Sequence, residues 1–214
     1  FIFKKRFSGE TDYFSNQAKI SVDEVFGDPK ACEANFVPDC RTFELVEDRK
    51  GGMGEIAQAF FEMANNIMTM HIHEQPSGTY KKAHHHGPGA HLICLSGQGY
   101  TLMWPVTAGI TAEGVQRVKV DWRKDSVFSP PDKWFHQHFV TSQEPARFLA
   151  FHAERSRKYK GVRPDTPGSG RRNIKLGGTQ IEYEDEDPEI RRLFKEELAK
   201  TGVSFQMSKY FPGE

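Results

Sequence analysis

The chain has little cysteine, no excess charge of either sign and no long apolar run among its 214 residues. Its 29 basic and 29 acidic residues balance, so we expect neither nucleic acid nor a membrane surface as a partner. No apolar stretch approaches the roughly 18 residues that a membrane span needs. The opening FIFKKRF lacks the apolar region of a signal peptide.

The cysteines are three, Cys32, Cys40 and Cys94, an odd number without the spacing of a metal site. This pattern predicts reduced thiols in a cytoplasmic protein. A disulfide between Cys32 and Cys40 is the alternative.

Histidine is absent from the first 70 residues and from the last 62. All nine histidines lie at positions 71, 73, 84, 85, 86, 91, 136, 138 and 152. Histidines that are only solvated surface residues should not be confined to one part of the chain. Their distribution predicts a site in the middle of the chain.

The region that holds the histidines, residues 66–155, reads as short β-rich segments separated by turn residues. The turn signals are at 76–78, 87–89, 96–99, 107–109 and 129–132. Short strands at a spacing of roughly 10 residues are typical of a β-sandwich or barrel. The abundance of rings, with 17 Phe, 6 Tyr and 3 Trp, favours an ordered core or pocket.

The flanking regions belong to the same single domain in our interpretation. We predict an irregular arm with some strand for residues 1–65. For residues 156–214 we predict a linker loop, a strand and a helix. The loop at 160–178 is rich in glycine and basic residues and is expected to be mobile. Asp187 is a suitable helix N-cap and Pro188 suits the first helical position. The apolar residues Ile190, Leu193, Phe194 and Leu198 then recur at helical spacing, which predicts one buried face.

The run His84-His85-His86 has metal-ligand spacing if it lies in a strand. Alternate side chains share a strand face and are about 6.5–7 Å apart. His84 and His86 therefore converge on an ion bound at about 2.0–2.1 Å, whereas His85 points away. A turn at 87–90 could bring a following strand back, so that His91 reaches the same ion. Far along the chain, His136 and His138 again share one strand face.

The segment from Gly78 to His91 resembles the first motif of the cupin superfamily. That motif runs a Gly, five residues, His-x-His, three or four residues, a Glu and later a Gly. Here His91 stands where the family usually has Glu, and Gly97 comes one residue early.

The second cupin motif, Pro-x-Gly-x-x-His followed after three residues by Asn, resembles the stretch from Pro131 to His136. Lys133 stands in the Gly place and Val140 in the Asn place. The run Pro-Pro-Asp-Lys-Trp-Phe-His-Gln-His-Phe at 130–139 also resembles a subset of cupins assigned as dioxygenases. The resemblance covers roughly residues 66–152.

The resemblance implies an all-β cupin barrel, a double-stranded β-helix or jelly roll, with an irregular N-terminal arm and a C-terminal α-helix. Residue by residue it implies His84, His86, His91 and His136 as metal ligands, with His138 replacing one of them or supporting them. The implied cofactor is one divalent ion per chain. We expect Fe(II), with Zn, Mn, Ni or Cu as alternatives. We also expect a homodimer.

The ligand set bears on the substrate. Four neutral imidazoles leave the ion its full charge, which favours a small anionic chelator such as an aromatic hydroxy acid or a catechol. The leading hypothesis is an Fe(II) dioxygenase that consumes O2. The alternatives are a lyase, decarboxylase or isomerase that uses the ion as a Lewis acid, and a binding protein without turnover.

Further residues are assigned to the predicted pocket. The catalytic candidates are Tyr80, His138 and His152, and the candidate pocket residues are Tyr100, Trp104, Trp134 and Arg147. Ordinary core packing is the alternative for the aromatic residues, and a solvated surface position is the alternative for Arg147. For His71, His73 and His152 a hydrogen-bonded core position is the first interpretation, and the alternative is that one of them donates a proton or orients a substrate.

Overall fold

The computed structural model describes residues 19–23, 28–33, 36–47, 54, 56–62, 68–87, 90–112, 114–153 and 172–212. The strands are β1 (Lys19–Asp23), β2 (Asp28–Glu33), β3 (Val46–Glu47), β4 (Ala57–Glu62), β5 (Met68–Gln75), β6 (His91–Ser96), β7 (Gln98–Pro105), β8 (Val118–Arg123), β9 (Val127–Phe128), β10 (Trp134–Val140) and β11 (Ala146–Ala153). The helix α1 spans Pro188–Thr201, and short 3-10 helices span Val106–Ala108, Ile174–Leu176 and Ser208–Tyr210. Most of the loop predicted at 160–178, up to residue 171, lies outside the described residues.

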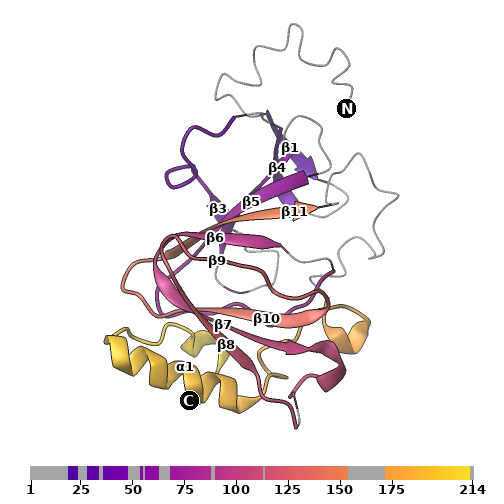
Figure 1. Cartoon of the computed structure of the whole chain (residues 1–214), viewed down its shortest axis with the longest axis vertical. Coiled ribbons are helices and arrows are strands. Elements are labelled where there is room, and N and C mark those ends of the chain that lie inside the picture. The colour runs from indigo at the N-terminus through magenta and orange to yellow at the C-terminus, as the bar shows by residue number, and fades with distance from the viewer. Residues whose placement is uncertain are drawn as a thin grey trace, which may run out of the picture.

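The strands form two sheets that face each other (Figure 1). The larger sheet has the order β1-β2-β4-β5-β11-β6-β9, with β3 also paired to β4, and the smaller sheet has the order β10-β7-β8. All the strand pairs that the structure describes are antiparallel except β2 with β4. The mostly β architecture predicted from the short, turn-bounded segments is confirmed.

A core lies between the two sheets. Phe148 and Cys94 of the larger sheet pack with Trp122 and Val140 of the smaller one. Because side chains alternate along a strand, Phe148 fixes which residues of β11 and of its neighbours face inward. We call this side of each sheet the inner face.

The outer face of the smaller sheet is covered by α1, as Figure 1 shows. Asp187 caps the helix by accepting a hydrogen bond from the backbone N–H of Glu189, and Pro188 occupies the first turn. The buried side chains of α1 are Ile190, Phe194 and Leu198. Burial of each contributes roughly 1.5–3 kcal/mol to the free energy of unfolding. The predicted helix, its cap and its buried face are confirmed.

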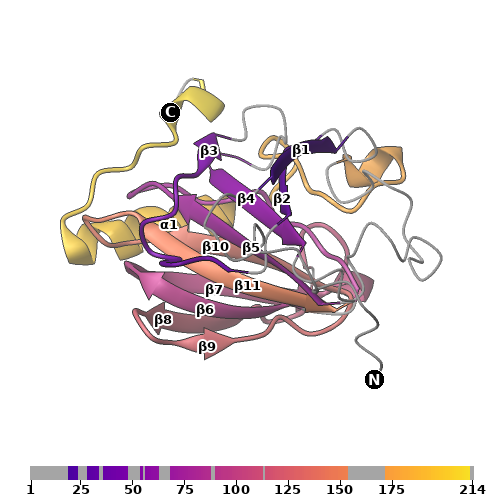
Figure 2. The same ribbon diagram turned by 90° about the horizontal axis from the view of Figure 1, so that it is seen from above.

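The N-terminal strands continue the larger sheet beyond β5 (Figure 2). On the outer face of this sheet, Phe61 and Ile72 form an apolar cluster that residues 37–45 cover. Arg147 fastens that cover, because its Nε donates to the carbonyl of Cys40 at 2.9 Å and its Nη1 pairs with Glu74 at 3.0 Å. The prediction that Arg147 lines a substrate pocket is therefore corrected: β11 directs it outward, where it holds the chain to the sheet.

A buried polar cluster ties α1 and the segment before it to the smaller sheet. The Glu186 carboxylate accepts hydrogen bonds from the Tyr80 hydroxyl and, at 3.2 Å, from Gln137 Nε2. Arg191 Nη1 lies 3.5 Å from the same carboxylate. Burial outweighs these favourable contacts and raises the pKa of Glu186 to about 7.

The raised pKa of Glu186 makes the stability of the protein depend on pH. Since the pKa of Glu186 is raised from 4.5 to about 7 on folding, its contribution is complete at acidic pH and is lost as the pH rises through 7. We expect the free energy of unfolding to fall by about 1–3 kcal/mol between about pH 5 and about pH 8. In Glu186→Gln, urea titrations at several pH values should show a flatter profile. The exposed neighbour variant Glu184→Gln should keep the wild-type slope, and equal slopes in wild type and Glu186→Gln would contradict this interpretation.

Candidate metal centre

The candidate metal centre begins with a backbone pairing between an extended segment and β10. His84 donates its N–H to the carbonyl of His136 at 3.2 Å, and His136 donates to the carbonyl of His84 at 2.9 Å. The backbone N–H of Lys133 donates to the carbonyl of His86 at 3.3 Å. Residues directly opposite in such a pair project to the same face. The pairing therefore sets His84 beside His136 on the inner face.

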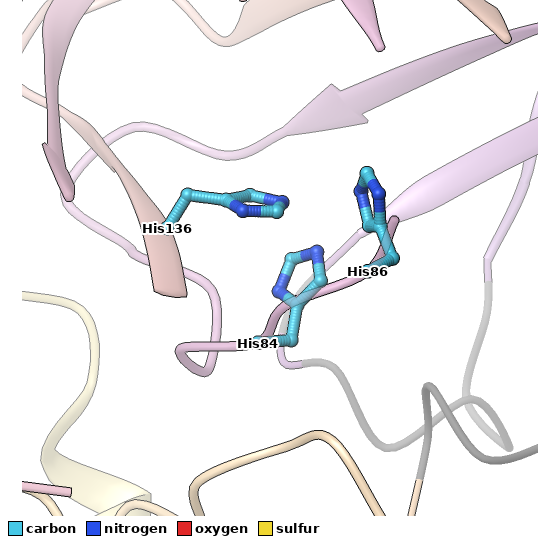
Figure 3. A group of neighbouring side chains, drawn as sticks. All are labelled: His84, His86 and His136. Atoms are coloured by element: carbon cyan, nitrogen blue, oxygen red, sulfur yellow. The ribbon is translucent and has the colours of Figure 1, made fainter. Parts of the chain in front are cut away.

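Three imidazoles meet at this point. His84, His86 and His136 each offer a ring nitrogen, and these nitrogens all lie within 4.8 Å of one another. Figure 3 shows the three rings turned toward a common centre. Nitrogens bound to one ion at about 2.1 Å lie at most about 4.2 Å apart, so small side-chain rotations suffice to complete the site. The metal-centre hypothesis thus gains its first geometric support from three of the four predicted ligands.

The tautomers of two of these rings are fixed by backbone carbonyls. His84 Nδ1 lies 3.0 Å from the carbonyl of Lys82, and His136 Nδ1 lies 3.0 Å from the carbonyl of Trp134. A carbonyl accepts only, so each Nδ1 carries the proton and each Nε2 keeps its lone pair. This arrangement is typical of histidines that bind metal through Nε2. The donor set therefore fits a divalent ion such as iron or zinc.

His91 lies outside this group. It is exposed at the start of β6, whereas its neighbour Leu92 faces the inter-sheet core. The hairpin that we expected does not form, because β6 pairs with β11 and β9 while the segment at 84–86 pairs with β10. The predicted four-histidine set is corrected to a group of three.

His138 follows His136 on the inner face of β10 and is buried. Its Nδ1 lies 2.8 Å from the Thr101 hydroxyl, which also accepts a hydrogen bond from Trp122 Nε1 at 3.0 Å. Burial, followed by the nearby Lys81 ammonium, lowers the pKa of His138. The structure thus places His138 beside the group of three rather than within it. The cation Lys81 is a neighbour that our sequence reasoning missed, although it lies within the first motif.

His152 also lies on the inner face, at the end of β11. Its ring centroid is 6.0 Å from that of His86, in an edge-to-face arrangement. On the other side, His152 Nε2 lies 2.7 Å from His71 Nδ1. The structure therefore brings this predicted catalytic candidate next to the group of three and connects it to another histidine.

Three predicted pocket aromatics lie on the opposite side of the smaller sheet. Tyr80, Tyr100 and Trp104 are fully buried in the core beneath α1. Tyr80 pairs with Phe139, whose side chain belongs to the same core, so it faces away from His136. The prediction of a catalytic Tyr80 and of pocket roles for Tyr100 and Trp104 is corrected to structural packing. Trp134, by contrast, is half-buried and shares the strand face of His136.

Comparisons with known proteins give only distant likenesses. No known protein-family pattern and no curated protein matches the chain. Among solved structures, the Cnp3 cupin domain of Schizosaccharomyces pombe is 17% identical, with 60% of this chain and 82% of that chain covered and a TM-score of 0.43. A cupin 2 conserved barrel domain protein from Rhodopseudomonas palustris is 13% identical, with coverages of 51% and 70% and a TM-score of 0.41. A mutant of the Bacillus subtilis oxalate decarboxylase OxdC is 15% identical, with coverages of 52% and 28% and a TM-score of 0.39.

The described residues also bear on two expectations about the chain as a whole. Cys40 and Cys94 are free thiols, and burial raises the pKa of Cys94 to about 12. The side chain of Cys32 lies outside the described residues. No helix in the described part of the chain is long and apolar enough to cross a membrane.

The turn before β10 carries a strained lysine next to the candidate centre. Lys133 has a φ of 55°, in the left-handed region, at the place where the second cupin motif has Gly. Its N–H donates to the carbonyl of His86, so the turn also positions a candidate ligand. A residue with a side chain in the left-handed region carries a strain of roughly 1–2 kcal/mol, which lowers the free energy of unfolding and which Gly avoids.

We expect Lys133→Gly to raise the free energy of unfolding by about 0.5–1 kcal/mol, because relief of strain exceeds the added freedom of the unfolded chain. Lys124 is a matched control, since it is exposed in a turn and its φ is not positive. Lys124→Gly should lower the same quantity by a similar amount. Urea denaturation measures both. A loss of stability in Lys133→Gly would contradict the assigned strain.

Proposed function

We propose that the chain is a cupin-type metalloenzyme that holds one divalent ion through His84, His86 and His136. The observation that carries the proposal is the convergence of these three imidazole nitrogens within 4.8 Å. Two of the rings are held by backbone carbonyls at 3.0 Å, which leaves their Nε2 atoms as ligands. Three protein ligands leave further positions on the ion for substrate and water, as in catalytic sites.

The charge of the site supports an anionic substrate. The group of three contains no carboxylate among the residues that the structure describes. Neutral imidazoles leave a divalent ion with its charge of +2, which attracts a chelating anion. We infer an aromatic hydroxy acid or a catechol-type compound as the substrate class. The half-buried Trp134, on the strand face of His136, is placed to contact an aromatic ring.

We further propose that the ion is Fe(II) and that the reaction is a dioxygenation. When bound, iron would supply the means to activate O2 beside a chelated substrate. The chain supplies orientation and a dry environment. His84 and His136 are held by their carbonyl partners, and Phe128 and Phe148 pack around His138 at ring-centroid distances of 5.8 and 5.9 Å. Such exclusion of water strengthens the electrostatic attraction between the ion and an anion.

A second candidate function is a lyase, decarboxylase or isomerase that uses the ion as a Lewis acid. The observation that favours it is the pair of buried imidazoles, His138 and His152, next to the group of three. A buried imidazole beside a bound substrate is a suitable acceptor for a substrate proton.

The proposed ligands predict which variants lose metal. We expect His84→Ala, His86→Ala and His136→Ala each to weaken metal binding by more than about tenfold, because each removes one of three donors. His91→Ala is the matched control and should retain the wild-type metal content. Elemental analysis of dialysed protein measures both. Full retention of metal in His86→Ala would contradict the ligand assignment.

The two chemistries are distinguished by oxygen consumption. We expect iron-loaded protein to consume O2 with at least one member of a panel of catechols, gentisate, salicylates and β-diketones. An oxygen electrode measures the rate, and zinc-loaded protein serves as the control. Absence of consumption across the panel by fully iron-loaded protein would contradict the dioxygenase and favour the second candidate.

A further inference from the structure

A series of hydrogen bonds crosses the smaller sheet and ends at His138, the buried histidine beside the candidate ligands. The indole Nε1–H of Trp122 donates to the Thr101 hydroxyl at 3.0 Å, and the same hydroxyl lies 2.8 Å from His138 Nδ1. Both distances are those of well-formed hydrogen bonds. All three side chains are buried, and His138 is only 3% exposed. We call this series the Trp-Thr-His chain.

The strand register brings the three side chains together. His138 of β10 lies directly opposite Thr101 of β7, so both project to the inner face. Trp122 of β8 lies opposite Gly99, which is two residues from Thr101 and therefore on the same face. A Cβ atom at Gly99 would lie 2.7 Å from the Trp122 ring. The absence of a side chain at Gly99 thus allows the indole to reach across β7 to Thr101.

The Thr101 hydroxyl determines where the ring of His138 carries its proton. An indole N–H only donates, so the hydroxyl oxygen accepts from Trp122. The hydroxyl has one proton of its own, and His138 Nδ1 is the one acceptor that receives it among the described residues. A bare Nδ1 requires that the ring proton be on Nε2.

The other tautomer of His138 is disfavoured by the same count of donors and acceptors. With its proton on Nδ1, the ring would donate to Thr101, and the hydroxyl proton of Thr101 would be buried without an acceptor. Such a buried, unsatisfied donor is costly. An imidazolium ring also carries a proton on Nε2. The donor at Nε2 is therefore present whether the ring is neutral or charged.

His138 Nε2 is directed toward the candidate metal centre. The two nitrogens of an imidazole point to nearly opposite sides of the ring, so Nε2 points away from Thr101 and β7. The segment that holds His84 pairs with β10 along its other edge, on the side away from β7. The ring of His138 lies 5.7 Å from that of His136, centroid to centroid. Nε2 has no hydrogen-bond partner among the described residues.

We propose that His138 Nε2–H donates a hydrogen bond to an anionic oxygen of the substrate bound at the candidate metal centre. This inference rests on the proposed function, because the ion held by the three candidate ligands would bring the anion to this place. His138 contacts the substrate, whereas Thr101 and Trp122 are positioning residues that keep its proton on Nε2.

The fixed donor assigns His138 a role different from that of its neighbours. A nitrogen that carries a proton has no lone pair for a metal, so His138 is not a fourth ligand. Hydrogen bonds to a charged acceptor are about twice as strong as those between neutral groups. The substrate class is thereby narrowed to chelators with an ionised oxygen, such as a phenolate or a carboxylate. In the second candidate function, His138 would stabilise negative charge on this oxygen and would not accept the substrate proton.

The first arm of the test locates the proton by NMR spectroscopy. Long-range 1H–15N correlation of 15N-labelled histidine distinguishes a protonated ring nitrogen from one with a lone pair. We expect His138 to carry a proton on Nε2 in metal-free and in zinc-loaded protein, with His138→Gln identifying the signal by its loss. A bare Nε2 in the metal-free wild type, or loss of its proton when zinc binds, would overturn the proposal.

Variants of Thr101 test the positioning role with the same spectrum. In Thr101→Val the hydroxyl is absent, so we expect the ring proton of His138 to be shared between Nδ1 and Nε2. Thr101→Ser is the matched control, since it keeps the hydroxyl, and it should give the wild-type signal. A wild-type signal in Thr101→Val would overturn the role assigned to Thr101.

The second arm measures the affinity of zinc-loaded protein for 4-nitrocatechol, whose absorbance reports its ionised form. We expect His138→Phe to weaken binding about tenfold or more, because the charged oxygen loses a donor. His138→Gln should keep the affinity within about twofold, since its amide N–H can take the place of Nε2–H. Zinc content should stay at the wild-type level in both variants. Wild-type affinity in His138→Phe, or equal weakening in both variants, would overturn the proposal.

The two arms separate this inference from the proposed function. Failure of the wild type to bind zinc or the probe would overturn the proposed function and, with it, the contact between His138 and a substrate. The position of the ring proton in metal-free protein is measured independently of that result. Normal zinc and probe binding together with a bare Nε2 would instead overturn the role of His138 and leave the metal centre intact.

Discussion

The two backbone hydrogen bonds between His84 and His136 join the parts of the molecule on which its candidate chemistry depends. They connect an extended segment, which precedes β6, to β10 of the smaller sheet. Because opposite residues in this pairing share a face, both imidazoles enter the space between the sheets. His86 follows two residues later and completes the group. The hydrogen bond from the N–H of Lys133 to the carbonyl of His86 extends the pairing, and it requires Lys133 to adopt a left-handed conformation in the turn.

The smaller sheet separates two very different environments. Its inner face carries His136 and His138, while its outer face carries the aromatic core that binds α1. Glu186 lies on the outer side, where burial raises its pKa to about 7. The inner side contains neutral imidazoles whose pKa values are lowered by burial, as for His73. The sheet thus has buried imidazoles on the side of the candidate centre and its buried acid, Glu186, on the far side.

The sequence was sufficient to predict the mostly β architecture, α1 with its Asp187 cap, and three histidines that the structure brings together, His84, His86 and His136. It was not sufficient to predict which face of the sheet each side chain occupies. In an uninterrupted strand Tyr80 and His84 would share a face, but the register with β10 shifts by one residue between them, so they face opposite sides. The prediction of His91 as a ligand is wrong for a related reason, since β6 pairs with β11 and does not return to the segment at 84–86. Such choices of partner depend on contacts between distant residues, which a strand pattern does not encode.

The proposed metal centre is defined most directly by the number of imidazoles that would bind the ion. Three neutral donors explain both the expected preference for an anionic chelator and the open positions for catalysis. X-ray absorption spectroscopy of protein loaded with one equivalent of iron or zinc counts these donors, because imidazole rings give a characteristic multiple-scattering pattern. We expect three imidazoles, with oxygen atoms as the remaining ligands, and the same spectrum in His91→Ala. Four imidazoles in the wild type that fall to three in His91→Ala, or a sulfur ligand, would contradict it.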